Sequence, residues 1–285
     1  MVLACHLRRS ILRLWDIEFK NPIFLASGTF GYGYEFPEVT REMGAIFTKG
    51  LTRSPRCGNE PPRIFEAPCG IINRVGLENV GVEKFIADIL PRIRDLTRIF
   101  VNIAGSEVED YVNLAQRLNG NVDGIEVNVS CPNVTRGLVF GQDPDLLYEL
   151  VREVKAVSRI PVVVKLTPNF CDISLTAKKA VSAGADGISL INTLNAGFYH
   201  NKKFYTGGLS GPAIKPLALY CVDRVRKVVD VPIIGIGGIT SGQDVIDFLD
   251  AGADAVAIGS INLKDPKAGK RILAEYNRLE GARRD

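Results

Sequence analysis

The sequence predicts a single α/β domain, a (β/α)8 (TIM) barrel. Eight short apolar runs rich in β-branched residues recur along the chain, and each precedes a longer stretch with helical periodicity. This alternation is typical of parallel strands that are buried on both faces. The length of 285 residues is close to the roughly 250 residues usual for such barrels. A chain of this length also suits two domains, but the repeated strand and helix units favour one.

The expected strands cover residues 23–27, 45–49, 99–103, 124–129, 162–166, 187–192, 232–236 and 255–258. A weak internal repeat marks the passage from helix to strand. Ala-Gly-Ala-Asp occurs at 183–186 and again at 251–254, and the segment that starts at Met43-Gly44 echoes it. We expect the glycine of this repeat to take the left-handed conformation just past a helix end.

Two regions depart from the regular alternation. Residues 51–80 are rich in Pro and Gly, which predicts a long loop insertion after strand 2 that folds over the barrel mouth, with a helix starting only at Gly81. We expect further lid loops at the C-terminal face, after Cys131 and within residues 194–205. Residues 1–11 are expected to form a short basic N-terminal extension, and residues 12–285 the barrel domain.

Composition excludes several classes of protein. The net charge of +3 is too small to predict a nucleic-acid surface. No apolar run reaches the roughly 18 residues of a membrane helix. The six cysteines include no C-x-x-C pair, so we expect no metal site and a cytoplasmic location. Cys171 and Cys221 are interpreted as small buried side chains, while pairing or burial stays open for Cys57 and Cys69.

Polar residues and glycines stand at the expected carboxyl ends of the strands, where barrels of this class carry their active sites. They are Ser27, Lys49, Asn102, Asn128, Cys131, Lys165, Asn192, Thr193, Gly237, Gly238, Gly259 and Ser260. Lysine is rarely buried without a partner, so the ring predicts a functional cluster. The glycines after the last two strands let backbone N–H groups approach an anion, which predicts a phosphate site.

The charged residues of this ring have two interpretations. Lys165 projects a cation into the mouth, where it would favour a reduced flavin, or it pairs with a strand-end carboxylate such as Glu126. Lys49 presents the same choice. Cys131, which follows strand four, is a candidate general base if its surroundings favour the thiolate.

The expected mouth is also rich in asparagine amides, which offer both donors and an acceptor and therefore suit a pyrimidine ring. We assign Asn79 and Asn195 instead to turns in which the side chain bonds to nearby backbone.

Several motifs in order carry a resemblance to a known family. They are NPIFLASGTFG, TKG, NRVGLEN, NVSCPN, FGQDP, VVVKLTP, INT, TGGLSGPAIKP and GIGGI. From Leu12 to the last helix the chain resembles the class 1 dihydroorotate dehydrogenases, and GGLSGPAIKP is similar to the NAD-linked B type rather than the fumarate-linked A type.

The resemblance implies a catalytic subunit that binds FMN and oxidises (S)-dihydroorotate to orotate in pyrimidine (UMP) biosynthesis. Cys131 would remove the C5 proton while hydride passes from C6 to N5 of FMN. Carried over by motif, the cofactor-binding residues are Ser27, Lys49, Gly50, Asn102, Asn128, Lys165, Ile191, Gly211, Gly237, Gly238, Gly259 and Ser260. The substrate-binding residues are Lys49, Asn73, Arg74, Val75, Gly76, Leu77, Asn128, Asn192 and Thr193.

The B type further implies a homodimer core within a heterotetramer, whose second subunit carries FAD and a [2Fe-2S] cluster and passes electrons to NAD. The chain itself offers neither the cysteine spacing for such a cluster nor a dinucleotide-binding fingerprint. The segments after NVSCPN and after INT are shorter than is usual in the family. The alternatives are a fumarate-linked A-type enzyme, an activity like dihydropyrimidine dehydrogenase, and a barrel that binds a phosphate ligand without redox chemistry.

Overall fold

Eight parallel strands close into a barrel at the centre of the computed structural model, which describes residues 11–129 and 140–284. Around the barrel the strand order is β10-β13-β14-β3-β4-β7-β8-β9. The strands are β3 (Ile23–Leu25), β4 (Ala45–Phe47), β7 (Arg98–Ile103), β8 (Gly124–Asn128), β9 (Val162–Leu166), β10 (Gly187–Leu190), β13 (Ile233–Ile236) and β14 (Ala255–Ile258). All eight predicted strands are present, although some end earlier than predicted. The predicted barrel is confirmed.

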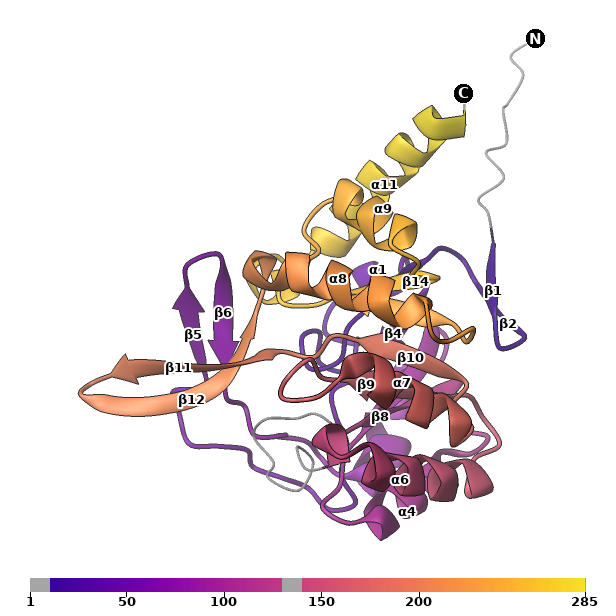
Figure 1. Cartoon of the computed structure of the whole chain (residues 1–285), viewed down its shortest axis with the longest axis vertical. Helices are drawn as coiled ribbons and strands as arrows, with labels where there is room; N and C mark the ends of the chain where they lie inside the picture. The colour runs from indigo at the N-terminus through magenta and orange to yellow at the C-terminus, as the bar shows by residue number, and fades with distance from the viewer. Residues whose placement is uncertain (1–10, 130–139, 285) are drawn as a thin grey trace.

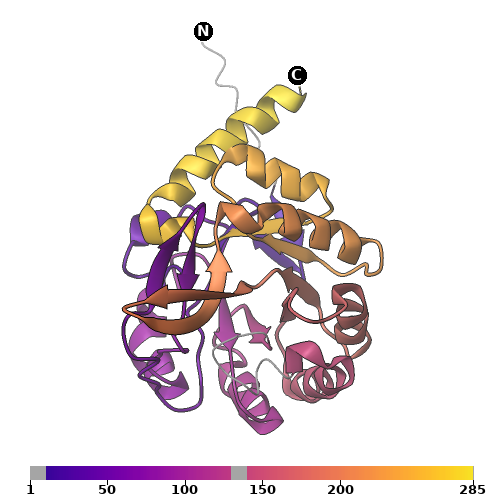
Figure 2. The same ribbon diagram turned by 60° about the vertical axis from the view of Figure 1, so that its left-hand side comes forward.

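Helices surround the barrel wall (Figures 1 and 2). They are α1 (Pro37–Thr40), α2 (Val82–Lys84), α3 (Leu90–Ile93), α4 (Val108–Leu118), α6 (Pro144–Val157), α7 (Ile173–Ser182), α8 (Lys215–Arg226), α9 (Gly242–Asp250), α10 (Ile261–Lys264) and α11 (Ala268–Arg284). A π-helical turn (Phe85–Ile89) joins α2 to α3, and a 3-10 turn (Pro212–Ile214) precedes α8. The helical segment expected from Gly81 is confirmed, since this residue is the N-cap of α2.

The repeated glycines and aspartates connect helix to strand. Gly184 and Gly252 follow the ends of α7 and α9 with φ of 98° and 107°, so the left-handed conformation predicted for them is confirmed. Gly44, in the third and weakest copy of the repeat, is required for a different reason. A Cβ at this position would collide with the carbonyl oxygen of Asn21. The aspartates Asp186 and Asp254 each accept a hydrogen bond from the backbone N–H at the start of the neighbouring strand, at 2.7 and 2.8 Å.

The lower half of the barrel interior is apolar. Because side chains alternate along a strand, Phe24, Phe47 and Phe100 all point inward and are buried together. A hairpin of β1 (Leu12–Leu14) and β2 (Ile17–Phe19) closes this end from below. Its Phe19 ring lies 5.0 Å from the Phe24 ring, and its Trp15 ring lies 5.3 Å from that of Phe100. Sequence reasoning missed this hairpin, because each strand has only three residues.

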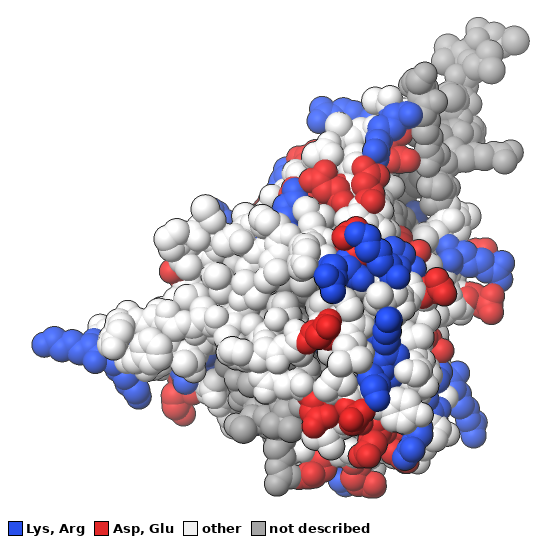
Figure 3. Space-filling model, viewed as in Figure 1, with Lys and Arg blue, Asp and Glu red and all other residues white. Residues whose placement is uncertain are grey.

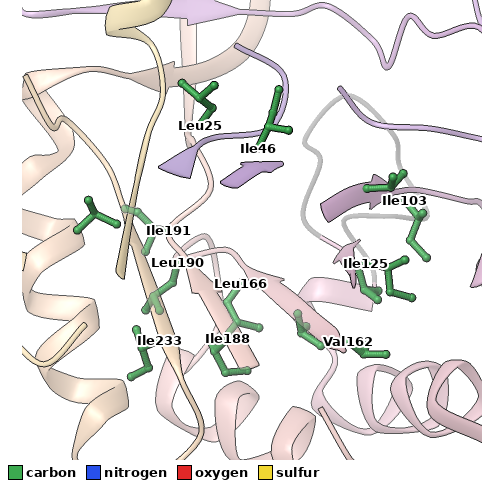
Figure 4. Packing of buried hydrophobic residues seen from close by; sticks show 14 of the residues in the cluster. Leu25, Ile46, Ile103, Ile125, Val162, Leu166, Ile188, Leu190, Ile191 and Ile233 are labelled. Atoms are coloured by element: carbon green, nitrogen blue, oxygen red, sulfur yellow. The ribbon is translucent and has the colours of Figure 1, made fainter. Parts of the chain in front are cut away.

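The strand residues that point outward form a second core against the helices. Figure 4 shows part of it, including Leu25, Ile46, Ile125 and Val162, whose side chains are fully buried. The two cores lie on opposite sides of the barrel wall. This explains why the strands read as nearly continuous apolar runs.

A separate antiparallel sheet covers one side of the barrel mouth. Its order is β11-β12-β6-β5, made of β11 (Leu194–His200), β12 (Lys203–Ser210), β6 (Gly70–Asn73) and β5 (Ile64–Ala67). The insertion expected at 51–80 is present at the mouth, and its residues 64–73 form a hairpin; residues 194–210 form a second hairpin where the sequence predicted a loop at 194–205, and the two pair through β12 and β6. A lone hairpin is marginal in water, so this pairing, invisible in either segment alone, makes both of them regular. Figure 1 shows the sheet projecting beyond the helices, and in Figure 2 it lies in front of the barrel.

The surface of this sheet differs from that of the helices. On the face shown in Figure 3, basic and acidic side chains are interspersed over the helices, whereas the projecting sheet is mostly uncharged. Tyr199 and Phe204 are exposed there.

Several smaller expectations are also resolved. Cys221 is buried, which raises its pKa to about 11, whereas Cys171 is half-buried. Cys57 and Cys69 are exposed free thiols, so neither pairing nor burial applies to them. Asn79 accepts a hydrogen bond from the N–H of Gly81 at 2.8 Å, as a turn of this kind requires. The turn expected at Asn195 is wrong, because that residue lies within β11.

The expected extension of residues 1–11 lies almost wholly outside the described residues. Within the described part of the chain, no helix combines the length and apolar character needed to cross a bilayer.

Three charged side chains anchor the segment after β13. Lys215, at the start of α8, donates hydrogen bonds to Asp244 and to Asp247, the latter at 2.7 Å. Asp244 in turn accepts from the backbone N–H and hydroxyl of Thr240 at 2.7 and 3.0 Å. The glycine-rich segment 235–240 is thereby tied to both α8 and α9.

The apolar lower half of the barrel, which the β1–β2 hairpin closes, leads to a first prediction. Phe19→Ala should lower the free energy of unfolding by about 3–5 kcal/mol, because it empties space beneath the barrel that no neighbouring element fills. Denaturant unfolding measures the change. Phe170→Ala is the matched control: its ring is 79% exposed, and truncation should change stability by less than about 0.5 kcal/mol. Equal effects of the two substitutions would contradict the role assigned to the hairpin.

The anchor around Lys215 generates a prediction on pH. Burial alone raises the pKa of Asp244, but hydrogen bonds from Lys215 and Thr240 outweigh it and hold the pKa below its ordinary value of 3.8. This carboxylate therefore stabilises the fold above that pH and loses its contribution as pH falls further. Lys215→Met should lower the free energy of unfolding by about 1–2 kcal/mol at pH 7. The difference from the parent protein should shrink below about pH 4 in denaturant titrations, and a difference independent of pH would contradict the assignment.

Candidate functional site

A polar layer lies directly above the apolar floor of the barrel. Inward-facing positions recur every second residue, so Asn102 stands one layer above Phe100, and Lys165 one layer above Val163. Both polar side chains are buried. Strands β7 and β9 thus change from apolar to polar inward-facing side chains toward their carboxyl ends, where the sequence predicts the site, whereas Ala26, Ile236 and Ala257 keep the ends of other strands apolar.

The centre of this layer is Glu126, whose side chain is 0% exposed. Its two carboxylate oxygens accept hydrogen bonds from the Ser189 hydroxyl and from the Asn102 amide, each at 2.6 Å. The Lys165 ammonium lies 3.9 Å from the same carboxylate and donates to the Ser27 hydroxyl at 2.9 Å. The carboxylate partner considered for Lys165 is therefore confirmed, although the lysine also reaches the cavity above.

A cavity with an empty volume of about 1200 Å³, measured out to its open mouth, lies on this layer. Among the residues predicted to form the site, those lining the cavity are Ser27, Lys49, Gly50, Asn73, Val75, Gly76, Leu77, Asn102, Asn128, Lys165, Ile191, Asn192, Thr193, Gly211, Gly237, Gly238, Gly259 and Ser260. The described lining does not include Arg74.

Arg74 turns away from the cavity although its neighbours line it. Its guanidinium donates to the carbonyl oxygen of Glu60 at 2.8 Å and lies over the Tyr205 ring at 5.2 Å from the centroid. The adjoining backbone is sharply turned, with φ of 78° at Gly76 and 56° at Leu77. These turns face the backbone after β6 toward the cavity and leave Arg74 on the outside of the sheet.

Lys49 provides a second cation at the mouth, and it is less buried than Lys165. Its ammonium lies 3.5 Å from Glu78, and the same carboxylate accepts a hydrogen bond from Arg63 at 2.6 Å. Glu78 is shared between the two cations. Lys49 can therefore meet an incoming anion without leaving Glu78 unpaired.

Glycines leave open space along another part of the wall. A Cβ added to Gly28 would find no described atom within 4 Å, and one added to Gly259 would meet side chains only at 3.7 Å or more. Gly237 and Gly238 have φ of 140° and 69°, a region that favours glycine. A ligand can thus approach the backbone closely here, as a phosphate group requires.

The amides beyond β10 are held in place by the backbone. Asn192 accepts a hydrogen bond from the N–H of Thr193 at 2.8 Å. Asn169 donates to the Thr193 carbonyl oxygen at 2.8 Å. Across the neighbouring strand β12, Asn73 donates to the Gly208 carbonyl oxygen at 3.2 Å. This side of the mouth therefore presents amides whose orientation is constrained.

Sequence reasoning missed several residues that line the cavity. They are Ala26, Gly28, Thr29, Ile64, Ile71, Glu78, Ser210, Ile214, Ile236, Ile239 and Leu263. Ile71 and Ser210 face each other in the pairing of β6 with β12, which the sequence does not reveal. Gly28 could have been found, because it follows the end of the first barrel strand as the other glycines follow theirs.

Cys131 lies outside the described residues. In sequence it follows Asn128, the last residue of β8 and part of the cavity lining, by three positions. Within the described residues, no group of three or more His, Cys, Asp or Glu side chains gathers to hold a metal ion.

Comparison with known proteins agrees with this geometry. A family model described as dihydroorotate dehydrogenase matches residues 11–279. A protein of Thermoanaerobacter sp. (strain X514), named dihydroorotate dehydrogenase B (NAD(+)), catalytic subunit, is 48% identical over 90% of this chain and 89% of its own length. A protein of the same name from Caldicellulosiruptor bescii is 50% identical over 88% of this chain and 87% of its own length.

A solved structure has the same fold. A crystal structure of DHODH from Eimeria tenella in complex with ferulenol superposes with a TM-score of 0.82 at 25% identity, covering 99% of this chain and 87% of that one. The match by the family model and the identity to the curated relatives both span most of the sequence, and they confirm the resemblance drawn from the motifs. The chain belongs to the dihydroorotate dehydrogenase family.

Proposed function

We propose that this chain oxidises (S)-dihydroorotate to orotate with FMN bound in the cavity, as the catalytic subunit of an NAD-linked B-type enzyme of pyrimidine biosynthesis. The observation that carries the proposal is one cavity in which two ammonium groups, several oriented amides and a glycine-lined wall come together. Membership of the family and the names of its relatives support it. The cytoplasmic location stays a prediction.

The residues present fit FMN. The open backbone at Gly28 and Gly259 suits the phosphate, because a side chain there would fill the space. Lys165 brings a buried positive charge to the floor of the cavity, where it would stabilise the negative charge of a reduced flavin. When bound, FMN supplies the acceptor for the hydride that leaves C6 of the substrate. Ser27, Asn102 and Asn128 would complete the contacts.

The other side of the cavity suits the substrate. Lys49 would pair with the carboxylate of dihydroorotate, since it stands at the open mouth beside a carboxylate that it shares with Arg63. The amides of Asn73, Asn128 and Asn192 would bind the alternating N–H and C=O groups of the ring. The backbone at residues 75–77 and Thr193 would close around them.

Cys131 would remove the proton from C5. It follows cavity residue Asn128 by three positions, and three residues of chain span at most about 11 Å. A thiol near its ordinary pKa of about 8.5 becomes an effective base when neighbouring groups favour the thiolate. The thiol would hold the proton that leaves carbon while the hydride leaves the adjacent carbon.

Electrons would then leave through a second protein. A [2Fe-2S] cluster needs four cysteines at characteristic spacing, which the six cysteines of this sequence do not have. FAD and the cluster would therefore belong to a partner subunit in a heterotetramer built on a homodimer of this chain. The word "subunit" in the names of the relatives supports such a partner.

The proposed base generates a prediction. Cys131→Ser should keep bound FMN and lose turnover by about 10²- to 10⁴-fold, as is usual when a general base is removed. Anaerobic addition of dihydroorotate to the FMN-loaded parent protein should bleach the flavin absorption rapidly, and the variant should bleach at a correspondingly lower rate. Cys57→Ser is the control, since Cys57 is an exposed thiol that should not matter. Unchanged bleaching in Cys131→Ser would remove this residue from the mechanism.

The proposed carboxylate contact generates another prediction. Lys49→Met should lower kcat/KM for dihydroorotate by about 10- to 100-fold, the worth of one charge-assisted hydrogen bond. It should change the much weaker reaction with dihydrouracil far less, because that ring has no carboxylate. Steady-state rates on both substrates give the comparison, with Lys227→Met, at the exposed residue that caps the end of α8, as control.

If the parent protein oxidised both substrates equally well, the alternative resembling dihydropyrimidine dehydrogenase would be favoured instead.

A further inference from the structure

A fully buried carboxylate lies beneath the cavity, outside its lining. Glu126 ties together four neighbouring strands, because its partners Asn102, Lys165 and Ser189 come from β7, β9 and β10. It is separated from a ligand by the residues above it, so it takes no direct part in the reaction proposed above.

Stability alone does not account for a glutamate at this position. Moving a carboxylate out of water costs several kcal/mol even when it is paired, and an apolar side chain of similar size often packs as well or better. The inward-facing residues one layer below are apolar and fully buried. The same barrel could therefore close with an apolar side chain here, and the charge calls for another explanation.

The charge acts on Lys165. The ammonium lies 3.9 Å from the carboxylate, and at that distance two charges interact strongly in an interior of low dielectric. Lys165 also lines the cavity and is held by the Ser27 hydroxyl at 2.9 Å. Glu126 thus fixes where the ammonium sits and offsets part of its field at the cavity floor.

We propose that Glu126 is a positioning residue that sets the reduction potential of the bound flavin by partly neutralising Lys165. The inference rests on the proposed FMN function and adds a determinant that lies behind the cavity wall. A reduced flavin carries extra negative charge, so a carboxylate below it disfavours reduction, and the neighbouring ammonium favours it. The pair keeps the cofactor easy to reduce by substrate and still able to pass its electrons on.

The test replaces the charge and keeps the shape. Glu126→Gln should shift the equilibrium of the bound cofactor toward the reduced form by at least about tenfold, which is about 30 mV for a two-electron couple. Equilibration with reference dyes measures this potential. Asp254→Asn is the matched control, because it neutralises a carboxylate at the opposite end of the barrel and should leave the potential unchanged.

Each outcome decides a separate point. A potential that stays unchanged or falls in Glu126→Gln overturns the inference, even if the variant is less stable, because a merely structural role lowers the melting temperature without moving the potential. Titration of the apoprotein with FMN measures binding of the cofactor independently of its reduction potential. Failure of the parent apoprotein to bind FMN at all would overturn the proposed function instead.

A second variant covers the case in which Glu126→Gln does not fold. Glu126→Met replaces the carboxylate by an uncharged, unbranched side chain of similar length, and its potential should rise as that of Glu126→Gln does. Glu126→Asp, which keeps the charge, should stay closer to the parent than either variant. A potential in Glu126→Met equal to that of the parent would also contradict the proposal.

Discussion

The alternation of side chains along eight closed strands is the constraint on which the rest of the structure depends. A barrel of this size has room for layers of side chains and no more, so each inward position must be filled from a known strand. Phe24, Phe47 and Phe100 fill the lower layer. One step further along β7 and β9, the inward-facing side chains are polar, and Asn102 and Lys165 form the floor of the cavity. The site is therefore a continuation of the core, built by the same register.

This constraint explains why the barrel part of the site was predictable. The carboxyl ends of the buried barrel strands all lie at the mouth. Lys165 and Asn128 could therefore be assigned to the mouth from the sequence alone. The glycines after β13 and β14 followed from the same argument. Lys165 shows the limit of this argument, because the two placements considered for that lysine are both correct. It faces the cavity and it pairs with Glu126, and only the three-dimensional register shows that these are compatible.

The antiparallel sheet β11-β12-β6-β5, which forms the roof of the cavity, was not predictable in the same way. Residues 64–73 and 194–210 are distant in sequence, and neither shows the long apolar run of a barrel strand. Their regularity arises when Gly208 pairs with Asn73, a contact that no local pattern announces. The motif NRVGLEN predicted that Arg74 contacts the substrate, but the described lining of the cavity does not include this residue. Neighbours in sequence alternate faces in an extended segment, so Arg74 points outward where Asn73 points in.

The floor and the roof of the cavity come from different structural elements. This suggests that the residues proposed to bind the cofactor and those proposed to bind the substrate are largely separate. Most of the residues proposed to hold the cofactor lie on the barrel strands or directly after their carboxyl ends, and the positions of these strands are fixed by two packed cores. Asn73 and the turn at Leu77 belong instead to the roof or border it, as does Thr193. The roof rests on pairing between two hairpins, and only some of its side chains, such as Leu194 and Leu209, pack against the outer core. Its other side chains can change without disturbing either core. Under the proposed function, the contacts from the roof to the ring can therefore vary separately from the residues proposed to hold FMN. Lys49, the proposed contact to the carboxylate, lies just after barrel strand β4 and belongs with the barrel.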